Sequence, residues 1–289
     1  MRVLITGSNG QLGSEIKELA TNYKKLDFIF KDLPELDICN FKVLQAFIID
    51  HNINVVINCA AYTAVDKAEE ESIIATKVNY EGVLNIVNAL AKVNGKLIHI
   101  STDYVFDGNH FLPYKESDSV SPIGVYGKTK RAGELAVINS AIDSMVIRTS
   151  WLYSSYGNNF VKTMLRLGSE KENLGVIFDQ VGTPTYARDL AKTCLEILCE
   201  NTSENISENG SLYHYSNEGV ASWYDFAISI MELGGKNCKV NPIQTKDYPT
   251  LAKRPHYSVL NKSKIKIDFK IEISYWRDSL KDCIEKIKN

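Results

Sequence analysis

Residues 3–13 read VLITGSNGQLG, an apolar run followed by a turn that contains three glycines. Val3–Thr6 is typical of a buried strand, and a helical pattern begins directly after the turn. The spacing, Gly7-x-x-Gly10-x-x-Gly13, differs from the common G-x-G-x-x-G, but the order of strand, glycine turn and helix is the same. Such glycines permit a tight turn and let backbone amides approach a pyrophosphate. The stretch therefore predicts a dinucleotide-binding unit.

The rest of the first half alternates apolar strands with amphipathic helices. We expect strands at 26–30, 55–61, 97–100 and 145–148, and helices at 14–22, 41–51, 73–93 and from 126 onward. Near-continuous apolar runs, such as 55–61, indicate parallel strands that are covered on both faces. The alternation predicts an α/β fold with a doubly wound parallel sheet of the Rossmann type.

After residue 150 polar loops separate shorter elements. We expect strands at 175–178 and 212–215, helices at 160–167, 187–199, from 223 and at 276–287, and a solvated loop at 200–211. Ser222 is the expected N-cap of the helix that begins at Trp223. The pattern predicts a Rossmann domain over residues 1–150, with returning segments near 176–218. Residues 151–289 are expected to form mainly a smaller substrate-binding lobe over the carboxyl edge of the sheet.

Composition excludes several classes of protein. The 289 residues carry a net charge of −2, which gives no indication of nucleic-acid binding, and the apolar runs are too short to span a membrane. The chain starts with a strand, which predicts no signal peptide. Six cysteines and five histidines lack metal-ligand spacing, so we expect reduced cysteines, no metal and a cytoplasmic location. Glu15 is expected to be a solvated carboxylate, and His99 a satisfied core histidine.

A second motif lies between Leu97 and Lys130. A strand is followed by Ser-Thr-Asp, in which Thr102 is the middle residue. A helix comes later, and on it Tyr126 and Lys130 share a face. A free phenol has a pKa near ~10, and a cation about 4 Å away can lower it by roughly three units. The motif therefore predicts that Lys130 lowers the pKa of Tyr126 and makes it a proton donor. The alternative is a chance Tyr-x-x-x-Lys on a solvated helix.

Several motifs together resemble the extended short-chain dehydrogenase/reductase family. They are the glycine turn Gly7–Gly13, AAYTAVD at 60–66, STDYVFDG at 101–108, and Tyr126-x-x-x-Lys130. Within the family the chain is most similar to the branch that reduces a dTDP-linked 4-keto-6-deoxy sugar. Two later elements, GTPT at 182–185 and Arg254-Pro255, extend the resemblance over essentially the whole chain.

The resemblance implies reduction of the C4 keto group of dTDP-4-dehydro-6-deoxy-L-mannose to dTDP-L-rhamnose in nucleotide-sugar biosynthesis. The reductant is NADPH or NADH, because Lys31-Asp32 after the second strand offers one base and one acid. Catalysis is implied for Tyr126 as the proton donor, Lys130 and Thr102. Cofactor binding is implied for Gly7, Gly10, Gln11, Leu12, Gly13, Asp37, Ile38, Ala61, Tyr62, Thr63, Tyr126 and Lys130. Substrate binding is implied for Thr102, Asp103, Trp151 and Arg254.

Other functions stay open. The substrate could be another nucleotide-linked 4-keto-6-deoxy sugar, because fold alone does not separate such sugars. A non-catalytic NADP-binding regulatory subunit, such as the one that accompanies methionine adenosyltransferase, is a second alternative, although the intact motif residues argue against it. Trp151 could be a core aromatic, and Arg254 a surface charge. The resemblance also allows a homodimer, and a divalent ion at acidic positions between subunits.

Overall fold

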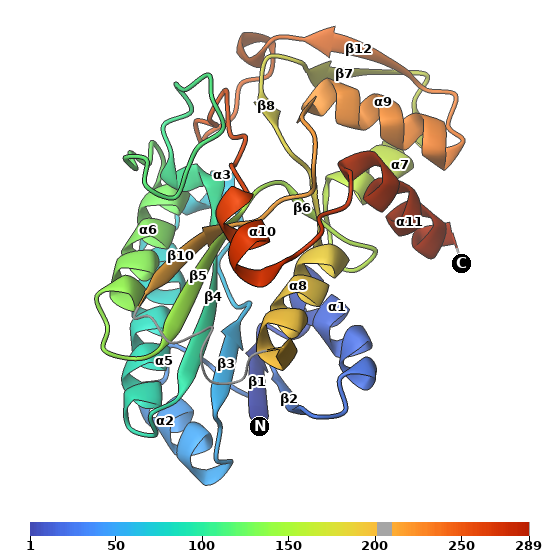
Figure 1. Cartoon of the computed structure of the whole chain (residues 1–289). Helices are drawn as coiled ribbons and strands as arrows, with labels where there is room; N and C mark the ends of the chain where they lie inside the picture. Colours follow the sequence, from blue (N-terminus) through green and yellow to red (C-terminus); the bar gives the residue numbers. More distant parts are fainter. Residues whose placement is uncertain (201–209, 289) are drawn as a thin grey trace.

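The structure is a computed structural model that describes residues 1–200 and 210–288 (Figure 1). Most of the predicted loop at 200–211 therefore lies outside the described residues. The central sheet has six strands in the order β10-β5-β4-β3-β1-β2, and every adjacent pair is parallel. The strands are β1 Arg2–Thr6, β2 Asp27–Lys31, β3 Val55–Asn58, β4 Lys96–Thr102, β5 Ser144–Thr149 and β10 Ser211–His214. This architecture confirms the predicted doubly wound α/β fold.

Helices cover both faces of the sheet (Figure 1). One face carries α2 Phe41–Asp50, α5 Gly82–Ala91 and α6 Val125–Ile138, and the other carries α1 Gln11–Leu19 and α8 Ala187–Glu200. Successive side chains of β1 point to opposite faces of the sheet. Leu4 packs on the side of α2, α5 and α6, whereas Val3 and Ile5 pack against α1 and α8. Burial on both sides explains why these strands are apolar at nearly every position.

A smaller lobe is built around its own hydrophobic cluster and lies above the sheet in Figure 1. Its helices are α7 Phe160–Glu170, α9 Trp223–Gly234 and α11 Trp276–Lys288. Its strands form three pairs: β7 Asn173–Ile177 with β12 Lys239–Ile243, β8 Val181–Gly182 with β11 Ala221–Ser222, and β6 Leu152–Tyr153 with β9 Thr185–Tyr186. Between β9 and β11 the chain returns to the sheet as α8 and β10, where β10 pairs with β5.

The predicted N-cap is confirmed. The Ser222 hydroxyl accepts a hydrogen bond from the Asp225 amide, and the Asp225 carboxylate accepts one from the Ser222 amide, so the two residues form a capping box. This box fixes the start of α9.

The predicted helix 73–93 is interrupted. It consists of α4 Ser72–Thr76, a π-helical turn Lys77–Glu81 and α5. The π-turn carries the buried Asn79, whose side chain bonds to the backbone of Tyr62 and to Thr129 on α6. Sequence periodicity does not reveal such a turn, because its flanks remain helical.

Other boundaries also differ from the prediction. The first helix begins at Gln11 instead of Ser14, and the third strand ends at Asn58 instead of Ala61. Several elements were not predicted from the sequence: α3 Val65–Ala68, α10 Ser263–Phe269, β12, the two-residue strands, and the 3-10 turns Ala20–Asn22, Asp103–Val105 and Thr245–Asp247. No helix among the described residues is both long and apolar enough to cross a bilayer.

Candidate functional site

A cavity of about 500 Å³ lies where the glycine turn, the end of β4 and the start of α6 meet. Twelve of the predicted site residues line it: Gly7, Gly10, Gln11, Leu12, Gly13, Ala61, Thr63, Thr102, Asp103, Tyr126, Lys130 and Trp151. Asp37, Ile38, Tyr62 and Arg254 are not part of this lining. The fold therefore brings the glycine motif and the Tyr-x-x-x-Lys motif, more than a hundred residues apart, into one cavity.

The glycine turn fits the pyrophosphate of a dinucleotide. Gly7 has φ +62°, and a Cβ there would lie 2.6 Å from the Ala60 nitrogen, whereas a Cβ on Gly13 would lie 2.5 Å from the Gly7 carbonyl oxygen. Gly10 is the N-cap of α1, no side chain caps this helix, and its first turn carries no acidic residue. The amides and the positive end of the helix dipole at α1 therefore remain suited to an anion.

The predicted adenosine side is well ordered by its own contacts. The Asp32 carboxylate accepts hydrogen bonds from the amides of Asn9 and Leu33, both at 2.8 Å, and Lys31 pairs with Glu35 at 2.6 Å. Asp37 accepts a bond from the Cys39 amide. Asp32 thus places a carboxylate beside the glycine turn, the position that contacts a ribose in such folds.

The segment 61–63 is held by Asn79. The Tyr62 amide donates to the Asn79 side-chain oxygen at 2.9 Å, and the Asn79 amide group donates to the Tyr62 carbonyl oxygen at 3.1 Å and to the Thr129 hydroxyl at 3.1 Å. The Tyr62 phenol bonds to Glu71 instead of lining the cavity. The sequence did not identify Asn79 as a site residue, because its role depends on the π-turn.

Tyr126 and Lys130 lie on the first turns of α6. Lys130 is buried, and its Nζ donates to the Ile100 carbonyl oxygen at 2.6 Å. Burial lowers the pKa of Lys130 to about 8, although Glu134 and Cys59 act in the opposite direction. Burial raises the pKa of Tyr126 to about 12, despite a hydrogen bond with Thr102 that lowers it. The predicted lowering of the phenol pKa is therefore wrong in this structure, because burial and the charge of Asp103 raise the pKa by more than the Thr102 hydrogen bond lowers it.

Thr102 and Asp103 complete this end of the cavity. The Thr102 hydroxyl donates to Asp103 Oδ1 at 3.0 Å, and the Tyr104 ring packs edge-on against the Tyr126 ring with centroids 5.5 Å apart. Burial raises the pKa of Asp103 to about 6. Within the described part of the chain Asp103 Oδ2 has no hydrogen-bond partner. The group therefore offers a buried acceptor beside the phenol and the threonine hydroxyl.

A buried ion pair lies one helical turn beyond Lys130. Arg148 on β5 donates to Glu134 on α6 through Nε and Nη2, both at 2.8 Å, and the two side chains are 1% and 0% exposed. Arg131 donates to the same carboxylate at 2.7 Å, and Arg148 Nη1 lies 3.4 Å from His214 Nε2. Glu134 lies on the helix predicted from 126 onward, but its partner Arg148 cannot be identified from spacing.

A second cavity of about 670 Å³ lies in the smaller lobe. Its lining includes Phe160, Met164, Leu174, Trp223, Tyr248 and Arg254. Trp151 from the first cavity stacks on Trp223 from the second, with centroids 3.6 Å apart and ring planes at 8°. One face of Trp151 is therefore already covered, so the predicted stacking on a sugar could use only the other face. The backbone of Trp151 is left-handed, with φ +48°.

Arg254 joins the two parts of the chain. Its Nη2 donates to Asp66 Oδ2 at 2.6 Å, and its Nη1 donates to Asp66 Oδ1 at 3.1 Å and to the Ala252 carbonyl oxygen at 3.2 Å. A guanidinium has five N–H donors, so two remain for a ligand. Arg254 is thus a fixed cation at the rim of the second cavity.

Three other predicted residue states have clear outcomes. The prediction that Glu15 is a solvated carboxylate is wrong. Its side chain is 0% exposed and is hydrogen-bonded to Ser154, Arg188 and Lys286. His99 is buried as predicted, with Nδ1 3.1 Å from Asn58, but Nε2 has no partner within the described chain. The described residues contain no disulfide bond. The described residues contain no group of three or more His, Cys, Asp or Glu side chains arranged for a metal ion.

The chain is similar in sequence to a known family and to several characterised proteins. The model of the RmlD substrate binding domain matches residues 1–289. A dTDP-4-dehydrorhamnose reductase of Aggregatibacter actinomycetemcomitans is 43% identical over 287 residues, covering 97% of both chains. SpsK of Bacillus subtilis, a spore coat polysaccharide biosynthesis protein, is 35% identical over 286 residues, covering 99% of this chain and 97% of SpsK.

Two solved structures are closely similar. A dTDP-4-dehydrorhamnose reductase from Clostridium acetobutylicum has a TM-score of 0.94 at 42% identity, with 100% of both chains covered. The enzyme of the same name from Bacillus anthracis, in complex with NADP, has a TM-score of 0.92 at 37% identity, with 99% of both chains covered.

Proposed function

The chain belongs to the RmlD substrate binding domain family, and from this premise we propose that it reduces dTDP-4-dehydro-6-deoxy-L-mannose to dTDP-L-rhamnose. The reductant is NADPH or NADH, and the product serves nucleotide-sugar and polysaccharide biosynthesis. The relatives named dTDP-4-dehydrorhamnose reductase support the reaction, and the relative in complex with NADP supports the cofactor.

One observation carries the proposal: the glycine turn and the phenol of Tyr126 line the same cavity, together with Thr102 and Lys130. Reduction of a ketone needs a hydride donor on one side of the carbonyl carbon and a proton donor at its oxygen. A bound NADPH or NADH supplies the hydride. The cavity has room for a nicotinamide beside a protein acid, which a binding module without catalysis does not require.

In the proposed mechanism Tyr126 gives its proton to the C4 oxygen as that oxygen gains negative charge. The pKa of about 12 keeps the phenol protonated at neutral pH, which is the form that a donor in the reductive direction needs. The Thr102 hydroxyl, which donates to Asp103 in the structure, rotates to donate its hydrogen bond to the same oxygen, a type of contact whose loss typically costs ~10²–10³ in rate. Lys130 contributes a fixed ammonium at the floor of the cavity, held by the Ile100 carbonyl oxygen.

The second cavity is proposed to take the nucleotide part of the substrate. Its apolar and aromatic lining suits a base, and Arg254 at its rim suits a diphosphate, because a guanidinium matches phosphate oxygens in geometry. The Trp151–Trp223 stack connects this cavity with the one that contains Tyr126. The sugar would then lie between the nucleotide and the phenol, beside Asp103.

The test is oxidation of NADPH by the purified chain with dTDP-4-dehydro-6-deoxy-L-mannose, and identification of the product by NMR. Tyr126→Phe should keep NADPH binding and lose about 10²–10⁴ of kcat. Tyr114→Phe, which removes a phenol hydroxyl bonded to Asp107 outside the cavity, is the matched control and should keep full activity. Wild-type turnover by Tyr126→Phe would remove Tyr126 from the mechanism.

The same assay separates the alternatives. A panel of nucleotide-linked 4-keto-6-deoxy sugars identifies the substrate by kcat/KM. NADPH that binds but is never oxidised by any of them would favour the regulatory subunit. We also propose a cytoplasmic location, which the lack of disulfide bonds among the described cysteines supports.

A further inference from the structure

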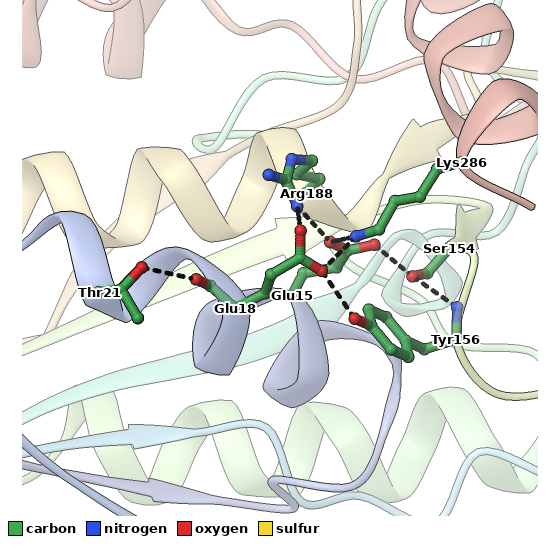
Figure 2. A network of polar contacts seen from close by, with 7 residues as sticks. All are labelled: Glu15, Glu18, Thr21, Ser154, Tyr156, Arg188 and Lys286. Atoms are coloured by element: carbon green, nitrogen blue, oxygen red, sulfur yellow. Dashed lines mark hydrogen bonds and ion pairs between the residues drawn. The ribbon is translucent and has the colours of Figure 1, made fainter. Parts of the chain in front are cut away.

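A cluster of charged side chains lies between α1, α8 and α11 (Figure 2). Glu15 and Glu18 of α1 share two cations. Arg188 of α8 donates to Glu15 at 3.2 Å and to Glu18 at 2.6 Å, and Lys286 of α11 donates to the same carboxylates at 3.0 Å and 2.5 Å. The Glu15 side chain is 0% exposed, so it depends on these partners.

The same carboxylates also hold the loop 154–159. The Ser154 hydroxyl donates to Glu15 at 2.6 Å and accepts from the Tyr156 amide at 3.0 Å, and the Tyr156 phenol donates to Glu18 at 2.7 Å. The Tyr156 ring in addition lies 4.8 Å from Lys286 Nζ, in a cation–π contact. The start of the loop is therefore fixed to α1 through its side chains (Figure 2).

The other end of the loop reaches the glycine turn. Gly157, Asn158 and Asn159 line the cavity that contains the turn. The Asn159 side chain donates to Gln11 Oε1 at 3.0 Å and to the carbonyl oxygens of Ser154 and Tyr156 at 2.7 and 3.3 Å. The loop is thus a short strap between the charged cluster and the proposed phosphate site, and no residue of the cluster itself lines the cavity.

We propose that Tyr156 and Lys286 are positioning residues for the cofactor: with Glu15 and Glu18 they hold the loop 154–159 against the glycine turn and so set the affinity for NADPH. This inference rests on the proposed function, because it takes NADPH as the ligand of the turn. Through the cluster and the loop 154–159, a side chain of α11 would act on the first turn of α1.

The charges make this arrangement stable at neutral pH. Burial raises the pKa of Glu18, but hydrogen bonds from Lys286, Tyr156 and Arg188 outweigh it and lower the pKa to about 2. A lowered carboxyl pKa means that the stabilisation is present above the ordinary value and is lost as the pH falls towards about 2. The Glu18 carboxylate therefore stays ionised at neutral pH.

The experiment measures NADPH affinity by calorimetry, without sugar, for Tyr156→Phe and Lys286→Met. If a freed loop is closed for only about 10–30% of the time, NADPH binding weakens about three- to tenfold. KM for NADPH should rise in parallel, while kcat at saturating NADPH and KM for the sugar stay at the wild-type values. Amide exchange of residues 154–159 should become faster in both variants.

Two controls separate positioning from general stability. Arg277→Met removes a cation of the same helix, paired at the surface with Glu232 of α9 at 2.7 Å, and should leave NADPH affinity unchanged. Lys286→Arg keeps a donor and should retain most of the affinity.

The inference is overturned if folded Tyr156→Phe and Lys286→Met bind NADPH like the wild type, or if Arg277→Met weakens binding equally. A wild-type chain that binds neither NADPH nor NADH would overturn the proposed function and this inference with it. A wild type that binds, with unaffected variants, would overturn the inference alone.

Discussion

The ion pair between Glu134 and Arg148 gives a quantitative prediction about the sheet behind the cavity. Both side chains are essentially unexposed, and two bonds of 2.8 Å join them. Removal of one partner of such a pair typically costs about 3–5 kcal/mol, because a buried charge is left without compensation. We therefore expect Glu134→Met and Arg148→Met each to lower the free energy of unfolding by an amount in this range.

The structure also predicts which variant suffers more. In Glu134→Met the guanidinium of Arg148 keeps a cation–π contact with Phe106 and His214 at 3.4 Å, but no carboxylate hydrogen bond that the structure shows. Burial lowers the pKa of His214 to about 3, so this histidine is neutral. In Arg148→Met the carboxylate of Glu134 keeps Arg131 at 2.7 Å. We expect a loss near ~5 kcal/mol for Glu134→Met and near ~3 kcal/mol for Arg148→Met.

Urea unfolding at neutral pH, followed by circular dichroism, measures these losses. The double variant has no unpaired buried charge, so its loss should be smaller than the sum of the single losses by about 2 kcal/mol or more. Arg166→Met, which breaks an exposed pair with Glu170, is the control and should cost no more than about 1 kcal/mol. Losses that simply add in the double variant, or a Glu134→Met protein as stable as the wild type, would refute the reasoning.

Three further predictions concern the cavity. Burial lowers the pKa of Lys130 to about 8, so if the ammonium is required, kcat measured across the alkaline range should fall as the pH rises through about 8; a flat profile to pH 10 would contradict this. Gly13→Ala places a methyl group 2.5 Å from the Gly7 carbonyl oxygen and should abolish NADPH binding in calorimetry, whereas Gly235→Ala, where a Cβ meets nothing within 4 Å, should bind NADPH normally even if it is less stable. Gly182→Ala brings a Cβ to 2.8 Å from the Trp151 ring and should raise KM for the sugar nucleotide with little change in NADPH affinity; an unchanged KM would separate Trp151 from substrate binding.

The sequence predicted those parts of the fold in which local pattern and tertiary role coincide. The strand before Gly7 is recognisable as a short continuous apolar run, and the helix that carries Tyr126 is recognisable by its good helix formers. The N-cap at Ser222 follows from the residue type itself. The π-turn around Asn79 could not be predicted, because it is defined by contacts with Tyr62 and Thr129, which lie far away in sequence.

For the site, too, the sequence predicted what local motifs determine and not what depends on distant contacts. The residues that the motifs identify meet in one cavity, because the ends of parallel strands converge at one edge of the sheet. Charge states escaped prediction: a phenol next to a lysine suggests a lowered pKa, but the burial of Tyr126 acts the other way. Glu15 reads as an exposed helical residue, and only the returning α8 and the terminal α11 enclose it.

The position of β10 has a consequence for how this polypeptide can be divided. The strand that completes the sheet beside β5 is made only after the chain has passed through the smaller lobe, and α8 from the same return covers α1. A fragment that stops at residue 150 would expose the unpaired main chain of β5 and the apolar side of α1 to water. Such a truncation should aggregate when expressed, and the two halves should regain a native form only when they are produced together.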